Sequence, residues 1–170
     1  MLRPHRLIDA WVKTLLASAC GCPVQGLIVA RDATVTVSPL PQHQAQALLQ
    51  DLLQAWRDGM ASPLPLASRT GLALLAGVND VAAVYDGAAY SRDGAAADPG
   101  EVQDACLARL YPTFDALAAD GRFARLAQHL LGPLLHWAQS AASVALHATP
   151  NAAAAAAAAD ADTAAADADD

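Results

Sequence analysis

The sequence predicts a helix-rich α/β domain with a small β element. Apolar residues recur at helical spacing along most of the 170-residue chain. Strand-type β-branched residues gather in one stretch, 27–37. A chain of this length favours a single domain, which we expect over residues 1–147. Residues 148–170 are almost entirely alanine and aspartate, so they offer little for a core to bury and predict a disordered acidic tail.

The first helix is predicted over residues 7–19. Gly21 and Pro23 end it, and Trp11 is its largest apolar anchor. The apolar side chains that share its inner face are Ile8, Trp11, Val12, Leu15, Leu16 and Ala19. Asp9 and Lys13 interrupt the apolar run, which favours an amphipathic helix over an export signal.

The only good strand signals are Leu27–Val29 and Thr34–Val37. A hairpin is the simplest arrangement for them. Because two strands alone are only marginally stable, we expect this hairpin to complete a sheet whose other strands come from elsewhere in a larger protein.

The stretch from Pro41 to Leu75 predicts a helix, a stiff proline strap and a second helix. Pro41 suits the first turn, Gly59 suits a left-handed stop, and two prolines, Pro63 and Pro65, prevent the helix from continuing. The second helix is expected near residues 69–76. The apolar face of the first comprises Ala45, Leu48, Leu49, Leu52, Leu53, Trp56 and Met60.

Shorter helices are predicted in the last third of the domain. Asn79 or Asp80 can cap one that ends near Tyr85, and a loop rich in Gly, Ala and Asp covers residues 86–100. Another helix opens at Pro99 and Glu101, and a short one forms around residues 114–117. The last runs from Phe123 towards Ala142 and should be kinked or divided at Pro133. The side chains expected to face inward on the Glu101 helix are Val102, Cys106, Leu107 and Leu110.

The charge balance argues against an autonomous nucleic-acid binder. The formal net charge is −7, and five of the acidic residues lie in the tail, so residues 1–150 carry only −2. Such a near-neutral body lacks a broad basic surface, and any DNA contact would have to be local or shared with a partner. The three cysteines, Cys20, Cys22 and Cys106, lack zinc-site spacing and are expected to be buried or half-buried thiols in a reducing cytoplasm.

No catalytic, cofactor-binding or metal-binding set is visible. The carboxylate pairs Glu101/Asp104 and Asp115/Asp120 are assigned to solvated helix faces or turns. His129 and His136 lack a completing carboxylate and are interpreted as surface or hydrogen-bonded histidines. The glycines and serines match neither a phosphate-binding loop nor a nucleophile elbow. Arg122 and Arg125 share a helix face and are candidate phosphate contacts, with a plain solvated face as the alternative.

Two stretches, residues 3–21 and 46–75, resemble the C-terminal domain of RecC, the gamma subunit of the RecBCD exodeoxyribonuclease V complex. Residues 104–117 and 130–135 also look familial, so the resemblance covers roughly residues 3–140. Its most specific part is the strap and the helix end before it, carried by Trp56, Arg57, Gly59, Pro63, Leu64 and Pro65.

This resemblance implies a degenerate PD-(D/E)xK nuclease-like fold without catalysis. The second strand, residues 34–38, agrees with that implication because it has neither a carboxylate nor a lysine to hold Mg²⁺. The implied role is a structural, DNA-handling part of an ATP-dependent helicase and exonuclease, a hydrolase of the cytoplasm that repairs double-strand breaks by homologous recombination. RecB-like and RecD-like subunits and DNA would be its partners, with no membrane involved.

Further expectations follow from the same resemblance. ATP and Mg²⁺ would belong to the partner subunits, and this chain would need no cofactor of its own. Since RecC proteins are much longer, the chain is expected to be a partial one.

Two other interpretations stay open from the sequence. One is an autonomous metal-dependent nuclease with atypical ligands, among them Asp32. The other is an exported lipoprotein processed at Cys20.

Overall fold

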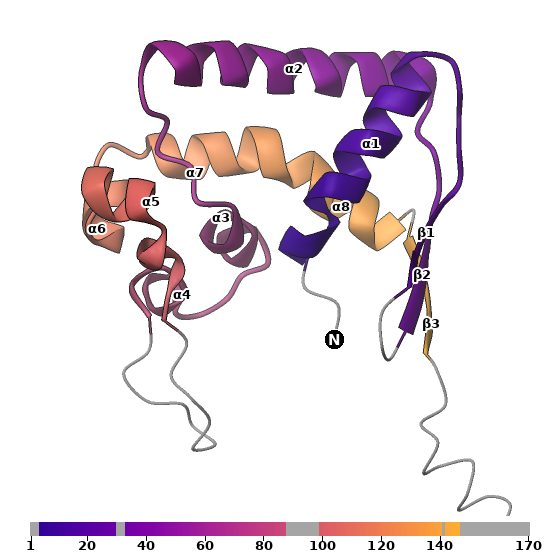
Figure 1. Ribbon diagram of the computed structural model, residues 1–170. Coiled ribbons are helices and arrows are strands. Elements are labelled where there is room, and N and C mark those ends of the chain that lie inside the picture. Colours follow the sequence, from indigo (N-terminus) through magenta and orange to yellow (C-terminus); the bar gives the residue numbers. More distant parts are fainter. Residues whose placement is uncertain (1–3, 30–32, 88–98, 141, 147–170) are drawn as a thin grey trace, which may run out of the picture.

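The computed structural model describes residues 4–29, 33–87, 99–140 and 142–146. It has the expected helix-rich α/β character. In Figure 1, α2 runs along one side of the molecule, α7 and α8 form a rod below it, and the sheet stands at one end. The elements in chain order are η1 (Pro4–Leu7), α1 (Ile8–Ala19), β1 (Gly26–Val29), β2 (Ala33–Val37), α2 (Gln42–Ala61), α3 (Ser68–Leu75), α4 (Val81–Asp86), η2 (Glu101–Gln103), α5 (Ala105–Leu110), α6 (Phe114–Ala118), α7 (Arg122–Leu126), η3 (Ala127–Leu131), α8 (Gly132–Ser140) and β3 (Ala142–Leu146).

The sheet has three antiparallel strands in the order β1-β2-β3. The predicted hairpin is confirmed, with Ile28 opposite Val35. The prediction that further strands come from outside is corrected, because β3 pairs with the free edge of β2 and places Val144 opposite Val35. The prediction that the last helix continues towards Ala142 is also wrong, since α8 ends at Ser140. Local alanine content favours helix there, but pairing with an open strand edge overrides it.

One hydrophobic cluster joins α1, the sheet and the C-terminal rod. Trp11, the predicted anchor of the first helix, is only 2% exposed. Trp137 packs in the same cluster, and its indole N–H donates to the Ser38 carbonyl at 3.1 Å, which ties α8 to the end of β2. The remaining buried members are Leu7, Leu15, Val35, Val37, Ala45, Leu72, Ala127, Leu131 and Leu134.

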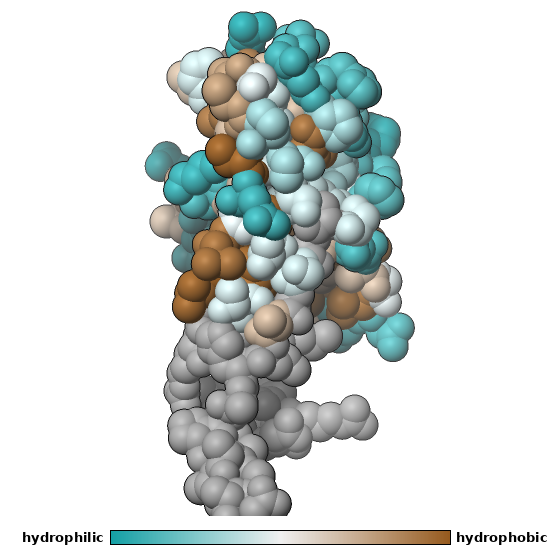
Figure 2. All heavy atoms as spheres, turned by 90° about the vertical axis from the view of Figure 1, so that its right-hand side faces the viewer, coloured by the Kyte–Doolittle hydropathy of each residue, from teal (hydrophilic) through white to brown (hydrophobic). Residues whose placement is uncertain are grey.

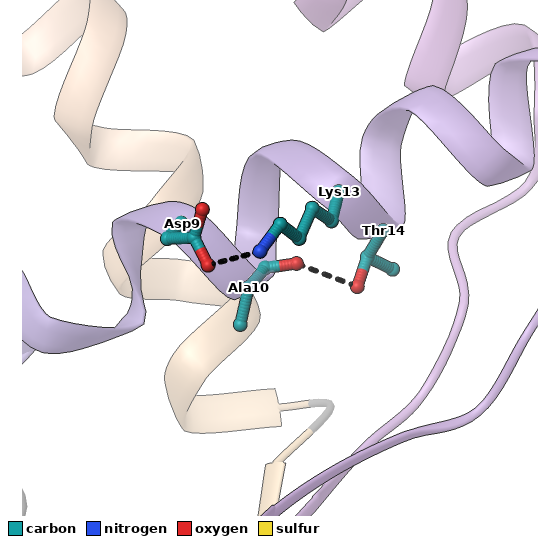
Figure 3. Close-up of polar contacts among 4 residues, drawn as sticks. All are labelled: Asp9, Ala10, Lys13 and Thr14. Atoms are coloured by element: carbon teal, nitrogen blue, oxygen red, sulfur yellow. Dashed lines mark hydrogen bonds and ion pairs between the residues drawn. The ribbon is translucent and has the colours of Figure 1, made fainter.

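The helix α1 carries two local polar contacts, one exposed and one part-buried. Lys13 Nζ donates to Asp9 Oδ2 at 2.7 Å across one helical turn, and Thr14 Oγ1 donates to the Ala10 carbonyl at 2.8 Å (Figure 3). The Asp9–Lys13 pair is exposed, so it adds only a few tenths of a kcal/mol, about 0.3–0.5. The stability of α1 therefore comes from the buried face that Trp11 leads.

A second, smaller cluster lies under the strap. Phe114 links two aromatic rings: its centroid is 6.4 Å from that of Tyr85 and 6.0 Å from that of Phe123, the latter pair edge to face. The Tyr85 hydroxyl donates to the Tyr111 carbonyl at 2.6 Å, so the buried phenol has a partner. Leu117 closes the cluster from α6.

The helix α3 belongs to both clusters and packs closely on the rod. At Gly71, an added Cβ would lie 2.7 Å from Leu131 Cδ1 and 3.2 Å from Ala127 Cβ, so a side chain here would require Leu131 to move. Leu72 enters the first cluster, and Leu74 packs against the second. The relative position of the two clusters thus depends on α3.

Glu101 caps the N-terminus of α3 from about thirty residues downstream in the chain. Its Oε1 accepts from the Arg69 N–H at 2.9 Å, and its Oε2 accepts from the Thr70 N–H at 2.7 Å and from Thr70 Oγ1 at 2.8 Å. The assignment of Glu101 to a solvated face is wrong, because unpaired N–H groups at a helix start attract a carboxylate. Asp104 is a conventional N-cap of α5 that accepts from the Cys106 and Leu107 N–H groups.

Other helix predictions are confirmed with shifted ends. Asp80 caps α4 by accepting from the Ala83 N–H at 2.9 Å, and Gly121 breaks the chain before α7 with a φ of +69°. Pro133 divides the last helix as expected: a π-helical segment, η3, separates α7 from α8 where the proline cannot donate.

Four side chains are placed differently from prediction. Cys106 and Leu110 are exposed on α5 and do not face inward, because Val102 and Leu107 alone fill the cluster from that side. Cys20 and Cys22 are exposed free thiols at the turn after α1, where the chain leaves the core, and are not buried.

Several sequence predictions concern residues outside the described ones, namely the loop over 88–98, Asp32 and the tail over 148–170. None of the helices in the described part of the chain is long and apolar enough to cross a membrane.

Replacing Glu101 by alanine should lower the free energy of unfolding by about 1–3 kcal/mol, because the N–H and hydroxyl groups of Thr70 lose their acceptor in a buried place. Urea unfolding followed by circular dichroism measures this. The matched control is Gln103→Ala on the same exposed turn, expected to change stability by less than about 0.5 kcal/mol. Equal losses for both variants would contradict the capping role.

Burial raises the pKa of Tyr85 above its ordinary value of 10.0, and repulsion from the Asp86 and Glu101 carboxylates adds to the rise. The folded state therefore holds this proton more tightly than the unfolded state. Ionisation of Tyr85 should therefore not change the free energy of unfolding below a pH of about 10. That free energy should fall as the pH rises from there through the raised pKa of Tyr85. Tyr85→Phe should remove this part of the alkaline decline in urea-unfolding experiments, whereas Tyr111→Phe should leave it in place.

Candidate functional site

The strap connects α2 to α3 over residues 62–67 and lies across the second cluster. Pro65 is buried, Leu64 is half-buried and Pro63 is exposed. The Tyr111 hydroxyl donates to the Pro63 carbonyl at 3.4 Å, which links the strap to the segment after α5. The strap thus has a structural role in covering the aromatic cluster.

Gly59 lies inside α2 and does not stop it. The helix continues to Ala61, and Gly59 is not among the glycines with positive φ, so the predicted left-handed stop is wrong. The helix ends where Ser62 turns extended before Pro63, as residues before a proline commonly do. A Cβ at Gly59 would lie 3.6 Å from Leu64 Cδ1, which shows that the strap folds back over this position.

The apolar face predicted for α2 is covered over only half its length. Ala45 is buried, and Leu48 and Leu52 pack partly against the first cluster. Towards the strap, Leu53 is 45% exposed, Trp56 63% and Met60 73%. We call these last three residues the exposed face of α2. Large apolar side chains that gather on one surface of a folded domain mark a contact with another molecule.

A second apolar surface lies on the sheet. Leu27 and Val29 of the edge strand β1 are 66% and 69% exposed, and Thr36 and Thr34 stand opposite them on β2. Figure 2 views the molecule from the sheet side and shows apolar residues at its surface.

An open groove of about 890 Å³, with both polar and apolar lining, lies between α2 and the rod. Arg125, one of the two arginines predicted to contact phosphate, lines it together with His129 and His136. Arg122 is not part of this lining: its side chain lies 4.0 Å from the Asp120 carboxylate. The complete lining is Gln44, Leu48, Ala124, Arg125, Gln128, His129, Gly132, Pro133 and His136.

The sequence pattern alone could relate only some of the groove residues to one another. Arg125, His129 and His136 recur at spacings of four and seven, which places them on one side of the rod. No local signal relates them to Gln44 on α2. Across the groove, His129 Nε2 lies 3.7 Å from Asp51 Oδ2 of α2.

The described residues contain no group of three His, Cys, Asp or Glu side chains able to hold a metal ion. The region expected to be a signal in the lipoprotein interpretation is α1, whose inner face is buried in the first cluster.

Residues 1–79 match the family model of the RecC C-terminal domain. The resemblance to the RecC C-terminal domain is therefore confirmed for this part of the chain. The match contains α1, the β1–β2 hairpin, α2, the strap and α3. No curated protein and no solved structure matches the chain.

The RecC match includes the exposed face of α2 and the six residues that carry the resemblance at the strap and the helix end before it, namely Trp56, Arg57, Gly59, Pro63, Leu64 and Pro65. The two later segments that also look familial, residues 104–117 and 130–135, lie beyond it, as does the rod that carries Arg122 and Arg125. The groove is thus built by one RecC-family helix, α2, and one helical rod outside the matched region.

Gly59→Ala should raise the free energy of unfolding by about 0.5–1 kcal/mol, because alanine favours a helix interior and meets Leu64 only at ordinary contact distance. Gly121→Ala should lower it by about 1–2 kcal/mol, since Gly121 has a φ of +69°. Thermal and urea unfolding of the two variants measure these opposite signs. If Gly59→Ala lowered the stability, the result would instead support a left-handed conformation at Gly59 that ends the helix.

Proposed function

We propose that this chain is a non-catalytic, structural and DNA-handling part of an ATP-dependent helicase–nuclease of the RecBCD type, working in the cytoplasm in double-strand-break repair by homologous recombination. The observation that carries the proposal is the exposed face of α2, which lies within the residues that match the RecC C-terminal domain. RecB-like and RecD-like subunits and DNA are the partners, and those subunits supply the ATP-driven and Mg²⁺-dependent chemistry.

The exposed face of α2 has the chemistry of a subunit contact. Burying each of its large side chains would contribute about 1.5–3 kcal/mol. Trp56 at its centre is the residue type most often dominant in protein interfaces. Gln50, Gln54 and Asp58 interrupt the apolar pattern and leave the other sides of the same helix polar and exposed.

The interpretation as a degenerate nuclease-like fold is part of this proposal. A hairpin followed directly by a long helix is consistent with it. On β2, Val35 and Val37 enter the core, and Thr34 and Thr36 take the other side, so this strand presents no carboxylate to a metal on either side. The hairpin is used for packing in the first cluster, which supports a structural role.

Trp56→Ser combined with Met60→Ser should abolish most of the assembly with partner subunits, because two large apolar contacts are replaced by polar ones. The full chain, carrying an affinity tag, is co-expressed with the RecB-like and RecD-like subunits of the same genome, and retained partner is quantified after pull-down. We expect at least about a tenfold reduction in the retained RecB-like subunit.

The matched control is Gln50→Ser with Gln54→Ser, two changes on the same helix away from its apolar face, expected to retain the partners as the parent chain does. Both double variants should melt within a few degrees of the parent, since the replaced side chains are exposed. Failure of the parent chain to retain either subunit would refute the proposed assembly.

A further inference from the structure

The groove between α2 and the rod is rich in hydrogen-bond donors and has no carboxylate in its lining. Arg125, His129 and His136 come from the rod, and the amides of Gln44 and Gln128 can donate beside them. Residues 1–150 are near-neutral, with a formal net charge of −2, and the groove gathers one fixed cation, two imidazoles and two amides in one place. Such a lining suits an anion.

The donors extend along the groove. Arg125 and His136 are separated by eleven positions on the rod, which corresponds to at most about 16 Å, because the π-helical segment η3 lies between them and is more tightly wound along its axis than an α-helix. That length equals the rise of about five nucleotides along one strand, at about 3.4 Å each. A linear polyanion therefore matches the arrangement better than a single small anion, which would use one end of it.

The floor of the groove is kept open and partly apolar. A Cβ at Gly132 would lie 3.2 Å from Gln128 Nε2, so the absence of a side chain there leaves space beside this amide. Leu48 and Pro133 supply apolar surface next to the donors. This combination of donors for phosphate and apolar surface for sugar and base is typical of sites that follow a nucleic-acid strand.

One acidic group stands near the groove. Asp51 on α2 faces His129 at 3.7 Å and is half-buried. Asp51 lies beside one imidazole only. Arg125 is exposed and has no carboxylate beside it in the groove lining, so it can contact a bound anion.

We propose that this groove binds the phosphodiester backbone of a DNA strand, with Arg125 as the main cationic contact and His136, Gln44 and Gln128 as further donors. The inference rests on the DNA-handling role proposed above and gives it a location that the family match does not include. Arg122, which is directed to Asp120, has no part in it.

The test measures binding of the full chain to a fluorescein-labelled single strand, and to its duplex, by fluorescence anisotropy at several salt concentrations. Arg125→Gln should raise the Kd for the strand about three- to tenfold and reduce the slope of log affinity against log salt by about 0.7. Gln128→Glu, which keeps the shape and adds a negative charge, should also weaken binding by at least about threefold.

The matched controls carry the same changes outside the groove: Arg109→Gln on α5 and Gln103→Glu on η2, both expected to leave the Kd within about twofold of the parent value. All four positions are exposed, so thermal melts should agree among the variants.

Three results would overturn the inference: no strand binding by the parent chain at low salt, equal losses in Arg109→Gln and Arg125→Gln, or displacement of the strand by inorganic phosphate at concentrations equal to its own. The last result would assign the groove to free phosphate. Arg125→Gln should still retain the RecB-like subunit in the pull-down described above. If the parent chain bound the strand but failed to retain the subunits, only the proposed assembly would be refuted and the groove proposal would stand.

Discussion

The Glu101 carboxylate binds the N–H groups of Arg69 and Thr70 at the start of α3, and the rest of the domain depends on where α3 lies. The cap gives two of the first N–H groups of this eight-residue helix a partner in a buried place. Its Gly71 then lies so close to Ala127 and Leu131 of the rod that an added Cβ would displace Leu131. A contact between two segments about thirty residues apart in the chain thus orders both hydrophobic clusters.

The helix α2 combines three environments along one amphipathic pattern. Its first half packs on the core through Ala45 and Leu48. Its second half leaves Trp56 and Met60 exposed, and a polar flank with Gln44 borders the groove. A helix that the domain covers only in part is well suited to a subunit of an assembly, since its remaining apolar surface gains from a partner. The RecC family match, which ends four residues after α3, includes this whole helix.

Some residues of the candidate site could be predicted from the local sequence pattern, but their surroundings could not. The strap could be recognised from its prolines, and Arg125 could be selected as a candidate phosphate contact because it shares a helix face with Arg122. Their different surroundings could not be predicted: Arg122 lies near Asp120, while Arg125 lines a groove with residues of α2. That difference depends on how α2 and the rod are packed, and no spacing within the rod encodes it.

The sequence by itself determined the helix-rich class, the positions of α1, α2 and α3, the hairpin and the capping of α4, because periodicity, β-branched residues and caps act within a few residues. Tertiary structure alone decided the rest. The strand β3 forms because β2 has an open edge, despite alanine-rich residues that favour helix. Gly59 lies inside a helix, and Glu101 caps the start of α3 instead of facing solvent. These outcomes depend on partners distant in the sequence, whose contacts outweigh local preferences of less than about 1 kcal/mol per residue.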